Sequence, residues 1–367
     1  MSGSVYGTLF TIATWGESHG DGIGVVVDGC PAGLLLDEAY IQTYLDRRKP
    51  GQTKYSTPRK EEDKVVILSG VFEGRTTGTP ISLTVYNENQ RSGDYSKIAS
   101  YYRPGHADYT FDQKYGFRDY RGGGRSSGRE TIGRVAAGAI ACAILQELGV
   151  QVKAYTRSIG PITIDPANLK LENISRSALC MPDLEASERA ETYLLEQMTE
   201  HNSAGGIIEC LVTGMPAGIG EPVFDKLDAS LAKAIMSIGA VKGVEIGDGF
   251  HSATVTGAEN NDPFYFDEKN GVTKTSNHAG GILGGISDGS DLILRAAIKP
   301  TPSIFRPQNT VNRDQENLEI QIHGRHDPII VPRAVVVVEA MVAITLVDQL
   351  FVGMTSQLSK IKDFYHR

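Results

Sequence analysis

The sequence predicts an α+β fold in which antiparallel strands pack on helices, formed as one unit from residues 1–367. The first observation is the order of the predicted elements, because strands and helices do not alternate regularly enough for a doubly wound parallel sheet. The second is that the sequence contains no linker, charge block or repeat that would divide the chain. We therefore predict a single domain.

In the first third of the chain, a capped helix and several strands are predicted. Residues 37–49 are typical of a helix, with Asp37 at the N-cap and basic side chains in the last turn, where they complement the helix dipole. Residues 87–127 show little periodicity, and so long an irregular segment within a compact domain is typically functional. Strands are predicted at 5–15 and, as a pair joined by a Gly/Thr turn, at 64–74 and 79–87.

The rest of the chain is predicted to contain two buried helices and several shorter elements. Apolar residues recur at helical spacing between 132 and 144, which predicts a closely packed helix over 128–148. The most apolar run, 334–347, is short for a bilayer span and carries Glu339, so a buried core helix is the better interpretation. Further strands are predicted at 150–160, 205–216 and 291–299, helices at 184–200, at 225–238 and from Pro332, and an irregular stretch at 247–289.

Composition narrows the class of protein. Apolar residues make up 40% of the chain and charged residues 22%, as in soluble globular proteins. A net charge of -8 argues against a general nucleic-acid or acidic-membrane binder, so local basic clusters indicate sites for small anions. The four cysteines are far apart, which predicts reduced thiols in a cytoplasmic protein and no metal site. The N-terminus lacks the pattern of a signal peptide.

The segment RDYRGGGRSSGRET, residues 118–131, is the strongest candidate for an anion site. Its three consecutive glycines allow close approach of a ligand to the backbone, and Ser126 and Ser127 offer donors just ahead of the predicted helix. Three arginines add charge-assisted bonds to phosphate or carboxylate; these are Arg125, Arg129 and Arg134. The alternative is a flexible Gly/Arg surface loop.

Three further residues are candidates for acid–base chemistry. His19 and His106 lie in glycine-containing loops, and imidazole can donate or accept a proton near neutral pH. Asp327 lies in GRHDPIIVPR, ahead of the last helix. Ordinary hydrogen bonding by either histidine and helix capping by Asp327 remain alternatives.

Three other segments contain basic residues or glycines that could contact a ligand. Arg48 and Lys54 belong to a second basic cluster, which could equally consist of solvated partners of a helix dipole. Residues 276–289 have paired glycines but lack the spacing of a dinucleotide fingerprint. Residues 299–305 combine a lysine, two hydroxyls and two prolines in a stiff loop. Together these features favour an enzyme that acts on a small polyanion by acid–base and electrostatic catalysis.

Long segments of the chain resemble the signature segments of the chorismate synthase family, in the family's order. They are GESHGDGIGVVVDGCPAG, RPGHADYTFDQKYGFRDYRGGGRSSGRETIGRVAAGAIA, SNHAGGILGGISDG, KPTPS and GRHDPIIVPRAVVVVEAM. The resemblance implies helices sandwiched between antiparallel four-stranded sheets. It implies conversion of 5-enolpyruvylshikimate 3-phosphate to chorismate and phosphate by a 1,4-anti elimination. This lyase reaction is the last step of the shikimate pathway, and the family requires reduced FMN (FMNH2) without net redox change.

The resemblance also implies roles for individual residues. His19 corresponds to a histidine that protonates the leaving phosphate, His106 to one that protonates reduced flavin near N1, and Asp327 to a carboxylate near flavin N5. Arg48 and Lys54 correspond to basic residues assigned to NADP or substrate phosphate, and Arg129 and Arg134 are further candidates for substrate anions. The implied flavin contacts are Arg125, Ser126, Ser127, Gly239, Ala240, Gly284, Lys299, Pro300, Thr301, Pro302, Ser303 and Arg325.

The implied assembly is a homotetramer supplied by an external flavin reductase, with NADPH only as an indirect reductant, because the members that reduce flavin themselves often carry inserts. Two positions depart from the family pattern: Lys54 often is arginine there, and Gly128 is frequently alanine. Lys54 keeps the charge but loses the bidentate fork. Two other functions remain open, a flavin-dependent oxidoreductase acting on a small phosphorylated acid and a non-catalytic phosphate or nucleotide binder.

Overall fold

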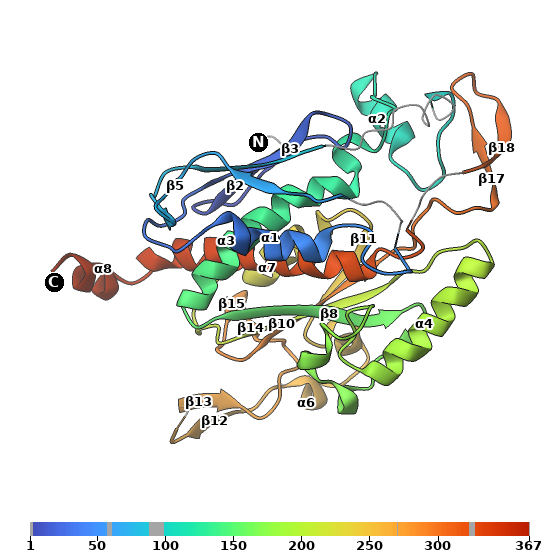
Figure 1. Ribbon diagram of the computed structural model, residues 1–367. Helices are drawn as coiled ribbons and strands as arrows, with labels where there is room; N and C mark the ends of the chain where they lie inside the picture. The colour runs from blue at the N-terminus through green and yellow to red at the C-terminus, as the bar shows by residue number, and fades with distance from the viewer. Residues whose placement is uncertain (1–2, 57–60, 88–98, 270, 323–326, 367) are drawn as a thin grey trace.

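The computed structural model describes residues 3–56, 61–87, 99–269, 271–322 and 327–366. Two antiparallel sheets enclose a layer of helices (Figure 1). The strand orders are β1-β2-β3-β7-β4 and β11-β16-β10-β8-β9. This architecture confirms the predicted α+β fold. Each sheet consists of four strands and a fifth edge strand of two residues, β1 or β9, which the expectation of four-stranded sheets omitted.

The bounds of the strands are as follows. The first sheet contains β1 (Val5–Tyr6), β2 (Thr11–Gly16), β3 (Gly22–Asp28), β7 (Ile81–Tyr86) and β4 (Val65–Ile67). The second contains β11 (Val241–Ile246), β16 (Leu292–Ile298), β10 (Gly206–Thr213), β8 (Gln151–Ile159) and β9 (Ile162–Thr163). In the described part of the chain, four hairpins lie outside the sheets: β5 (Val71–Phe72) with β6 (Arg75–Thr76), β12 (Phe264–Asp267) with β13 (Gly271–Lys274), β14 (Ile282–Leu283) with β15 (Ile286–Ser287), and β17 (Pro307–Val311) with β18 (Asn317–Gln321).

The helices include most of those predicted. They are α1 (Glu38–Arg48), α2 (Asp108–Tyr115), α3 (Thr131–Glu147), α4 (Leu184–Thr199), α5 (Leu227–Met236), α6 (Gly257–Asn260), α7 (Val331–Val352) and α8 (Leu358–Tyr365). Asp37 caps α1, its side chain accepting a hydrogen bond from Tyr40 N at 2.7 Å. Figure 1 shows α1, α3 and α7 between the two sheets.

Helices α3 and α7 form the centre of the core. Small side chains on α3 allow a close approach, because a Cβ added at Gly138 would lie 2.2 Å from the Ala340 Cβ. Val331–Thr355 is long and apolar enough to cross a membrane by length and composition, and 83% of its most apolar window is buried inside the protein. A helix that is apolar on all sides is typically buried in this way. The predicted core helix is therefore confirmed.

One buried carboxylate of this apolar helix, Glu339, has partners from two other layers. Glu339 is 3% exposed. It accepts hydrogen bonds from both terminal nitrogens of Arg47 on α1, at 2.6 and 3.0 Å, and from Ala154 N on β8 at 3.1 Å. Burial of a carboxylate is costly unless it is paired. Arg47, at the basic end of α1, therefore pairs with a buried carboxylate of α7 and is not simply a solvated partner of the helix dipole.

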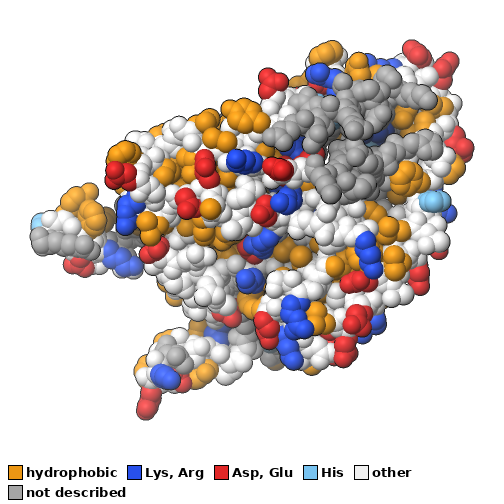
Figure 2. Space-filling view, viewed as in Figure 1, with side chains coloured by type: hydrophobic (Ala, Val, Ile, Leu, Met, Phe, Trp, Pro, Cys, Tyr) orange, Lys and Arg blue, Asp and Glu red, His pale blue; other side chains and the backbone are white. Residues whose placement is uncertain are grey.

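Several expectations about irregular segments were wrong. The segment 87–127 contains α2, and 247–289 contains α6 and two hairpins. Strands β3 and β11 were not predicted. Helix α3 begins at Thr131 rather than near 128, because a 3-10 turn, Gly128–Glu130, precedes it. The hairpin β12–β13 and helix α8 project from the body and carry exposed apolar side chains, among them Phe266 and Tyr365 (Figure 2).

Candidate functional site

The glycine-rich segment packs directly on the turn that carries His19. A Cβ added at Gly122 would lie 2.4 Å from His19 Nδ1, so only glycine allows this approach. His19 follows β2, and its Nδ1 lies 3.1 Å from Ser18 Oγ. Nearby, hydrogen bonds from Arg121 lower the pKa of Asp119, and the charge of His19 adds a smaller lowering of that pKa. The first loop histidine is therefore next to the predicted anion segment.

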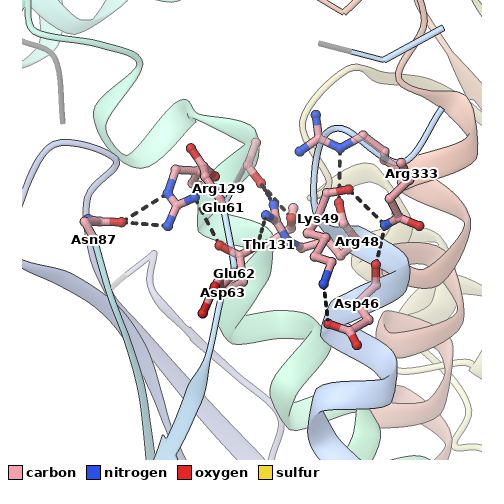
Figure 3. A network of polar contacts seen from close by, with 12 residues as sticks. Asp46, Arg48, Lys49, Glu61, Glu62, Asp63, Asn87, Arg129, Thr131 and Arg333 are labelled. Atoms are coloured by element: carbon pink, nitrogen blue, oxygen red, sulfur yellow. Dashed lines mark hydrogen bonds and ion pairs between the residues drawn. The ribbon is translucent and has the colours of Figure 1, made fainter. Parts of the chain in front are cut away.

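Asn87, at the end of β7, connects the His19 turn to Arg129. Its Nδ2 donates to Glu17 O at 3.0 Å and to Gly20 O at 2.8 Å. Its Oδ1 accepts from Arg129 Nε at 3.1 Å and from Nη2 at 2.7 Å (Figure 3). The Asn87 side chain therefore links the turn that carries His19, a candidate acid, to Arg129, a candidate anion-binding residue.

A buried carboxylate joins Arg129 to Arg48. Asp63 Oδ1 accepts from Arg129 Nη1 at 3.2 Å, and Asp63 Oδ2 accepts from Arg48 Nη2 at 2.5 Å. The Asp63 side chain is 0% exposed and that of Arg48 is 2% exposed. Arg129 Nη1 also donates to Glu61 (Figure 3). Arg48 and Arg129, which were predicted from separate segments, therefore belong to one network.

Asp327 reaches the same network through Arg333 at the start of α7. Arg333 Nη1 donates to Asp327 Oδ2 at 2.6 Å, and its Nε donates to Arg48 O at 3.1 Å. Burial lowers the pKa of Arg333 although Asp327 lies beside it. The structure therefore brings together three residues predicted from the first and last parts of the chain: Arg48, Arg129 and Asp327.

The other two predicted arginines, Arg125 and Arg134, share a second carboxylate. Glu130 Oε2 accepts from Arg134 Nε at 2.7 Å, and Glu130 Oε1 lies 3.7 Å from Arg125 Nη2. Arg125 Nη2 also donates to Thr14 Oγ1 at 2.6 Å, and its Nη1 donates to Gly16 O at 3.1 Å, so this side chain lies along β2. Each of the three predicted arginines therefore has a carboxylate partner in the protein itself.

The two serines and the turn after α5 lie beside these arginines. Ser126 Oγ donates to Gly123 O at 2.6 Å, and Ser127 Oγ accepts from Arg129 N at 3.3 Å, which caps the 3-10 turn. Arg134 Nη1 donates to Ser237 Oγ at 2.6 Å, two residues before Gly239. Ala240 O in turn accepts from Lys299 N at 2.9 Å.

A second cluster forms where residues 299–303 lie on the His106 loop. His106 Nε2 lies 2.8 Å from Ser303 Oγ, and Lys299 Nζ donates to Gly105 O at 2.8 Å. A Cβ added at Gly105 would lie 2.7 Å from the Pro302 Cβ. Thr301 Oγ1 is buried and has no hydrogen-bond partner among the described residues. Lys299, Pro302 and Ser303 therefore contact the His106 loop, and Pro300 and Thr301 lie between them in the chain.

A buried ion pair holds the His106 loop in shape. Arg103 donates to both carboxylate oxygens of Asp108 at 2.8 Å, and Arg103 N donates to Asp108 Oδ2 at 3.0 Å. Burial raises the pKa of Asp108, but the hydrogen bonds and charge of Arg103 and the charge of Arg118 leave it below its ordinary value. His106 N donates to Arg103 O at 3.2 Å, so the histidine is directly tied to this pair.

Two of the predicted site residues that the structure describes, Gly284 and Lys54, are not brought into these clusters. Gly284 lies in the β14–β15 turn, where the next residue, Gly285, accepts from Leu227 N at the start of α5. Gly239 follows the other end of that ten-residue helix, which is about 15 Å long. Lys54 has a side chain 65% exposed, with Nζ 3.8 Å from Glu191 on α4. Arg325 lies outside the described residues.

Sequence reasoning missed the neutral and acidic partners of the predicted residues. Asn87, Asp63, Glu61 and Asp108 meet their arginines through tertiary contacts that local patterns do not encode. Glu130 could have been found, because it lies four residues before Arg134, the spacing at which opposite charges pair on a helix.

The fold and the site together are typical of an α+β enzyme that holds anions beside acid–base groups. The chain belongs to the chorismate synthase family, because the family model described as chorismate synthase matches residues 10–351. It is 69% identical to the chorismate synthase of Lachnoclostridium phytofermentans over 367 residues, covering 100% of both chains. It is 55% identical to that of Methanosarcina acetivorans over 353 residues, covering 95% and 96%.

A solved structure titled "Crystal Structure of Chorismate Synthase" has the same fold. It aligns with a TM-score of 0.78 at 32% sequence identity, and the alignment covers 98% of this chain and 97% of the other. The resemblance first noted in the sequence is therefore confirmed at the level of the family and of the fold.

Proposed function

We propose that this enzyme converts 5-enolpyruvylshikimate 3-phosphate to chorismate and phosphate by a 1,4-anti elimination that depends on reduced FMN. Membership of the family supports the proposal, and one structural observation carries it. Asn87 hydrogen-bonds both the turn of His19 and the guanidinium of Arg129. A proton donor can protonate a leaving phosphate only if it is held beside the group that binds that phosphate, and the Asn87 bridge holds the His19 turn beside Arg129.

The chain's own residues then have distinct tasks. Arg48 and Arg129 bind the anionic groups of the substrate, since guanidinium forms bidentate bonds to phosphate and carboxylate. Arg134 and Lys54 are further candidates for such anions, and for NADP phosphate in the case of Arg48 and Lys54. His19 donates a proton to the departing phosphate. His106, held by Ser303, and Asp327, held by Arg333, exchange protons beside the cofactor.

The residues of the second cluster fit a cofactor that carries polar groups. Thr301 Oγ1 is buried without a described hydrogen-bond partner, and a buried hydroxyl normally has one. Lys299 has no carboxylate partner among the described residues and so offers its charge to a phosphate. When bound, reduced FMN would lend electron density to the substrate transiently and recover it. The residues that would hold it are Arg125, Ser126, Ser127, Gly239, Ala240, Gly284, Lys299 to Ser303 and Arg325.

The proposal extends to the organisation of the protein. One hydrophobic cluster includes residues of both sheets and of the helices between them, which supports a single catalytic domain over 1–367. Exposed aromatic side chains on β12 (Phe264 and Phe266) and on α8 (Phe364 and Tyr365) favour self-association, and on this ground and the family resemblance we propose a homotetramer. We further propose a cytoplasmic enzyme that receives reduced flavin from an external reductase, with NADPH as an indirect reductant.

An anaerobic assay of the full chain tests the function. The protein is mixed with enolpyruvylshikimate phosphate and chemically reduced FMN, and chorismate, phosphate and flavin absorbance are followed together. Chorismate and phosphate formed in equal amounts over many turnovers, with the flavin still reduced, are expected. Flavin oxidised in proportion to product would instead indicate an oxidoreductase, and binding without product a non-catalytic protein.

A further inference from the structure

The guanidinium of Arg129 is surrounded by three acceptor side chains from two segments of the chain, residues 61–63 and Asn87. Asn87 Oδ1 accepts from Nε and Nη2, while Asp63 and Glu61 accept from Nη1 (Figure 3). Arginine has five N–H donors in one plane, carried by three nitrogens. All three nitrogens are engaged by these contacts. An anion that binds this guanidinium through two hydrogen bonds must therefore displace at least one of the acceptors.

Two of the three acceptors are held in place from elsewhere. Asn87 is fixed by its two hydrogen bonds to the carbonyls of the His19 turn. The Asp63 carboxylate is 0% exposed and also binds Arg48 at 2.5 Å. Displacing Asp63 would leave the buried guanidinium of Arg48 without this carboxylate, which is strongly unfavourable. Neither acceptor can move aside at low cost.

Glu61 differs from both in its surroundings. Its side chain is 19% exposed, and among the described residues its carboxylate pairs with Arg129. Glu61 and Asp63 both contact Arg129, whereas the Glu62 side chain between them is exposed. The Glu61 carboxylate can therefore turn toward solvent without leaving a buried charge.

We propose that Glu61 is an internal anion that competes with the substrate for the Nη1 edge of Arg129 and so weakens the affinity of the site for small phosphorylated or carboxylated ligands. This inference rests on the proposed function, in which Arg129 binds a substrate anion. Glu61 and an incoming phosphate carry charge of the same sign, so both cannot occupy one edge of the guanidinium favourably. The competition lowers affinity for the phosphate product as well as for the substrate.

Binding of inorganic phosphate to the full-length protein tests the competition directly. By isothermal titration calorimetry, Glu61→Gln should lower the dissociation constant of phosphate about tenfold, the effect of removing one charge-assisted competitor. Glu62→Gln is the matched control, because it removes the same charge from the neighbouring, exposed position. Phosphate binding that is unchanged or weaker in Glu61→Gln, or equally tightened in Glu62→Gln, would overturn the inference.

A double-mutant cycle shows whether the effect passes through Arg129. In an Arg129→Gln background, Glu61→Gln should no longer change the phosphate dissociation constant. A tenfold change that persists there would assign the effect to another cation and reject the inference. The KM for enolpyruvylshikimate phosphate should fall in Glu61→Gln in parallel. If the wild type formed no chorismate, the proposed function would fail, while the phosphate titrations would still decide the role of Glu61.

Discussion

The His19 turn and the His106 loop place two similar side chains by different means. Both histidines lie in loops next to glycines that allow close packing. The His19 turn is bound by the Asn87 amide, which also binds the Arg129 guanidinium. His106 instead contacts the hydroxyl of Ser303, and a buried ion pair stabilises its loop from behind.

This difference supports the proposed assignment of His19 to the substrate and of His106 to the cofactor. A group that protonates a leaving phosphate must lie beside cations that bind the phosphate, as the His19 turn does. A group that exchanges protons with a bound cofactor needs a fixed orientation, which a hydroxyl and a rigid loop provide. Changes around His19 should therefore alter the handling of substrate, and changes around His106 the response to flavin.

The largest expected effect on turnover comes from removing the imidazole of His19 or of His106. We expect His19→Ala and His106→Ala each to reduce turnover about 10²- to 10⁴-fold, the usual range for positioned acid–base groups. Stopped-flow and steady-state chorismate formation with reduced FMN in excess measure the loss. Only His106→Ala should also change the dependence of the rate on flavin concentration. Near-normal turnover in both variants would show that the two loop histidines are structural.

The buried pair behind His106 predicts a loss of stability that depends on pH. Asp108→Asn leaves the buried Arg103 without its carboxylate, which should cost on the order of 3 kcal/mol of unfolding free energy at pH 7. The pKa of Asp108 is below its ordinary value. Its stabilisation is therefore fully present above the unfolded pKa of about 3.9 and is lost as the pH falls through the folded pKa.

Urea unfolding of wild type and Asp108→Asn between pH 7 and pH 3 measures this difference. It should be constant down to about pH 4.5 and then shrink toward lower pH. Glu62→Gln, which alters an exposed carboxylate, serves as the control and should unfold like the wild type. A difference that grows as the pH falls would contradict the assigned pairing.

The Asn87 bridge predicts a moderate effect on substrate binding. Asn87→Ala removes two hydrogen bonds to the His19 turn and one of the three acceptors of Arg129, so we expect KM to rise about tenfold with a smaller fall in kcat. Steady-state kinetics with saturating reduced flavin separate the two constants. Asn168→Ala, at an exposed position, is the control. A loss confined to kcat would mean that the bridge orients His19 without affecting the guanidinium.

The parts of the fold that could be predicted are those with long periodic segments. The patterns of α3 and α7 span 17 and 22 residues and face a continuous core. Helix α2 buries only Asp108 among its eight residues, so it has no apolar stripe to detect. Strands of two to four residues in the hairpins β12–β13 and β14–β15 are too short for an alternating pattern, and their pairing depends on turns.

In the site, too, some features could be predicted from the sequence and others could not. Arg48, Arg129 and Asp327 were recognisable from charge beside glycine-rich or helix-terminal segments. Their connection through Asp63 and Arg333 was not, because Asp63 and Arg129 are 66 positions apart and meet only in the folded chain. Side-chain types suggest which groups can act, whereas tertiary packing determines which carboxylate already neutralises each guanidinium.

The smallest effect is expected from the hydroxyl beside His106. Ser303→Ala removes one hydrogen bond at 2.8 Å, which should reduce turnover about threefold to tenfold. Because a hydrogen bond favours one protonation state of the imidazole, the pH profile of kcat should shift as well, which loss of packing alone would not cause. Ser69→Ala, at an exposed position of another segment, is the control. An unchanged profile would show that Ser303 supports the loop without tuning His106, and the contrast between the two histidines would then rest on Asn87 and on the Arg103–Asp108 pair.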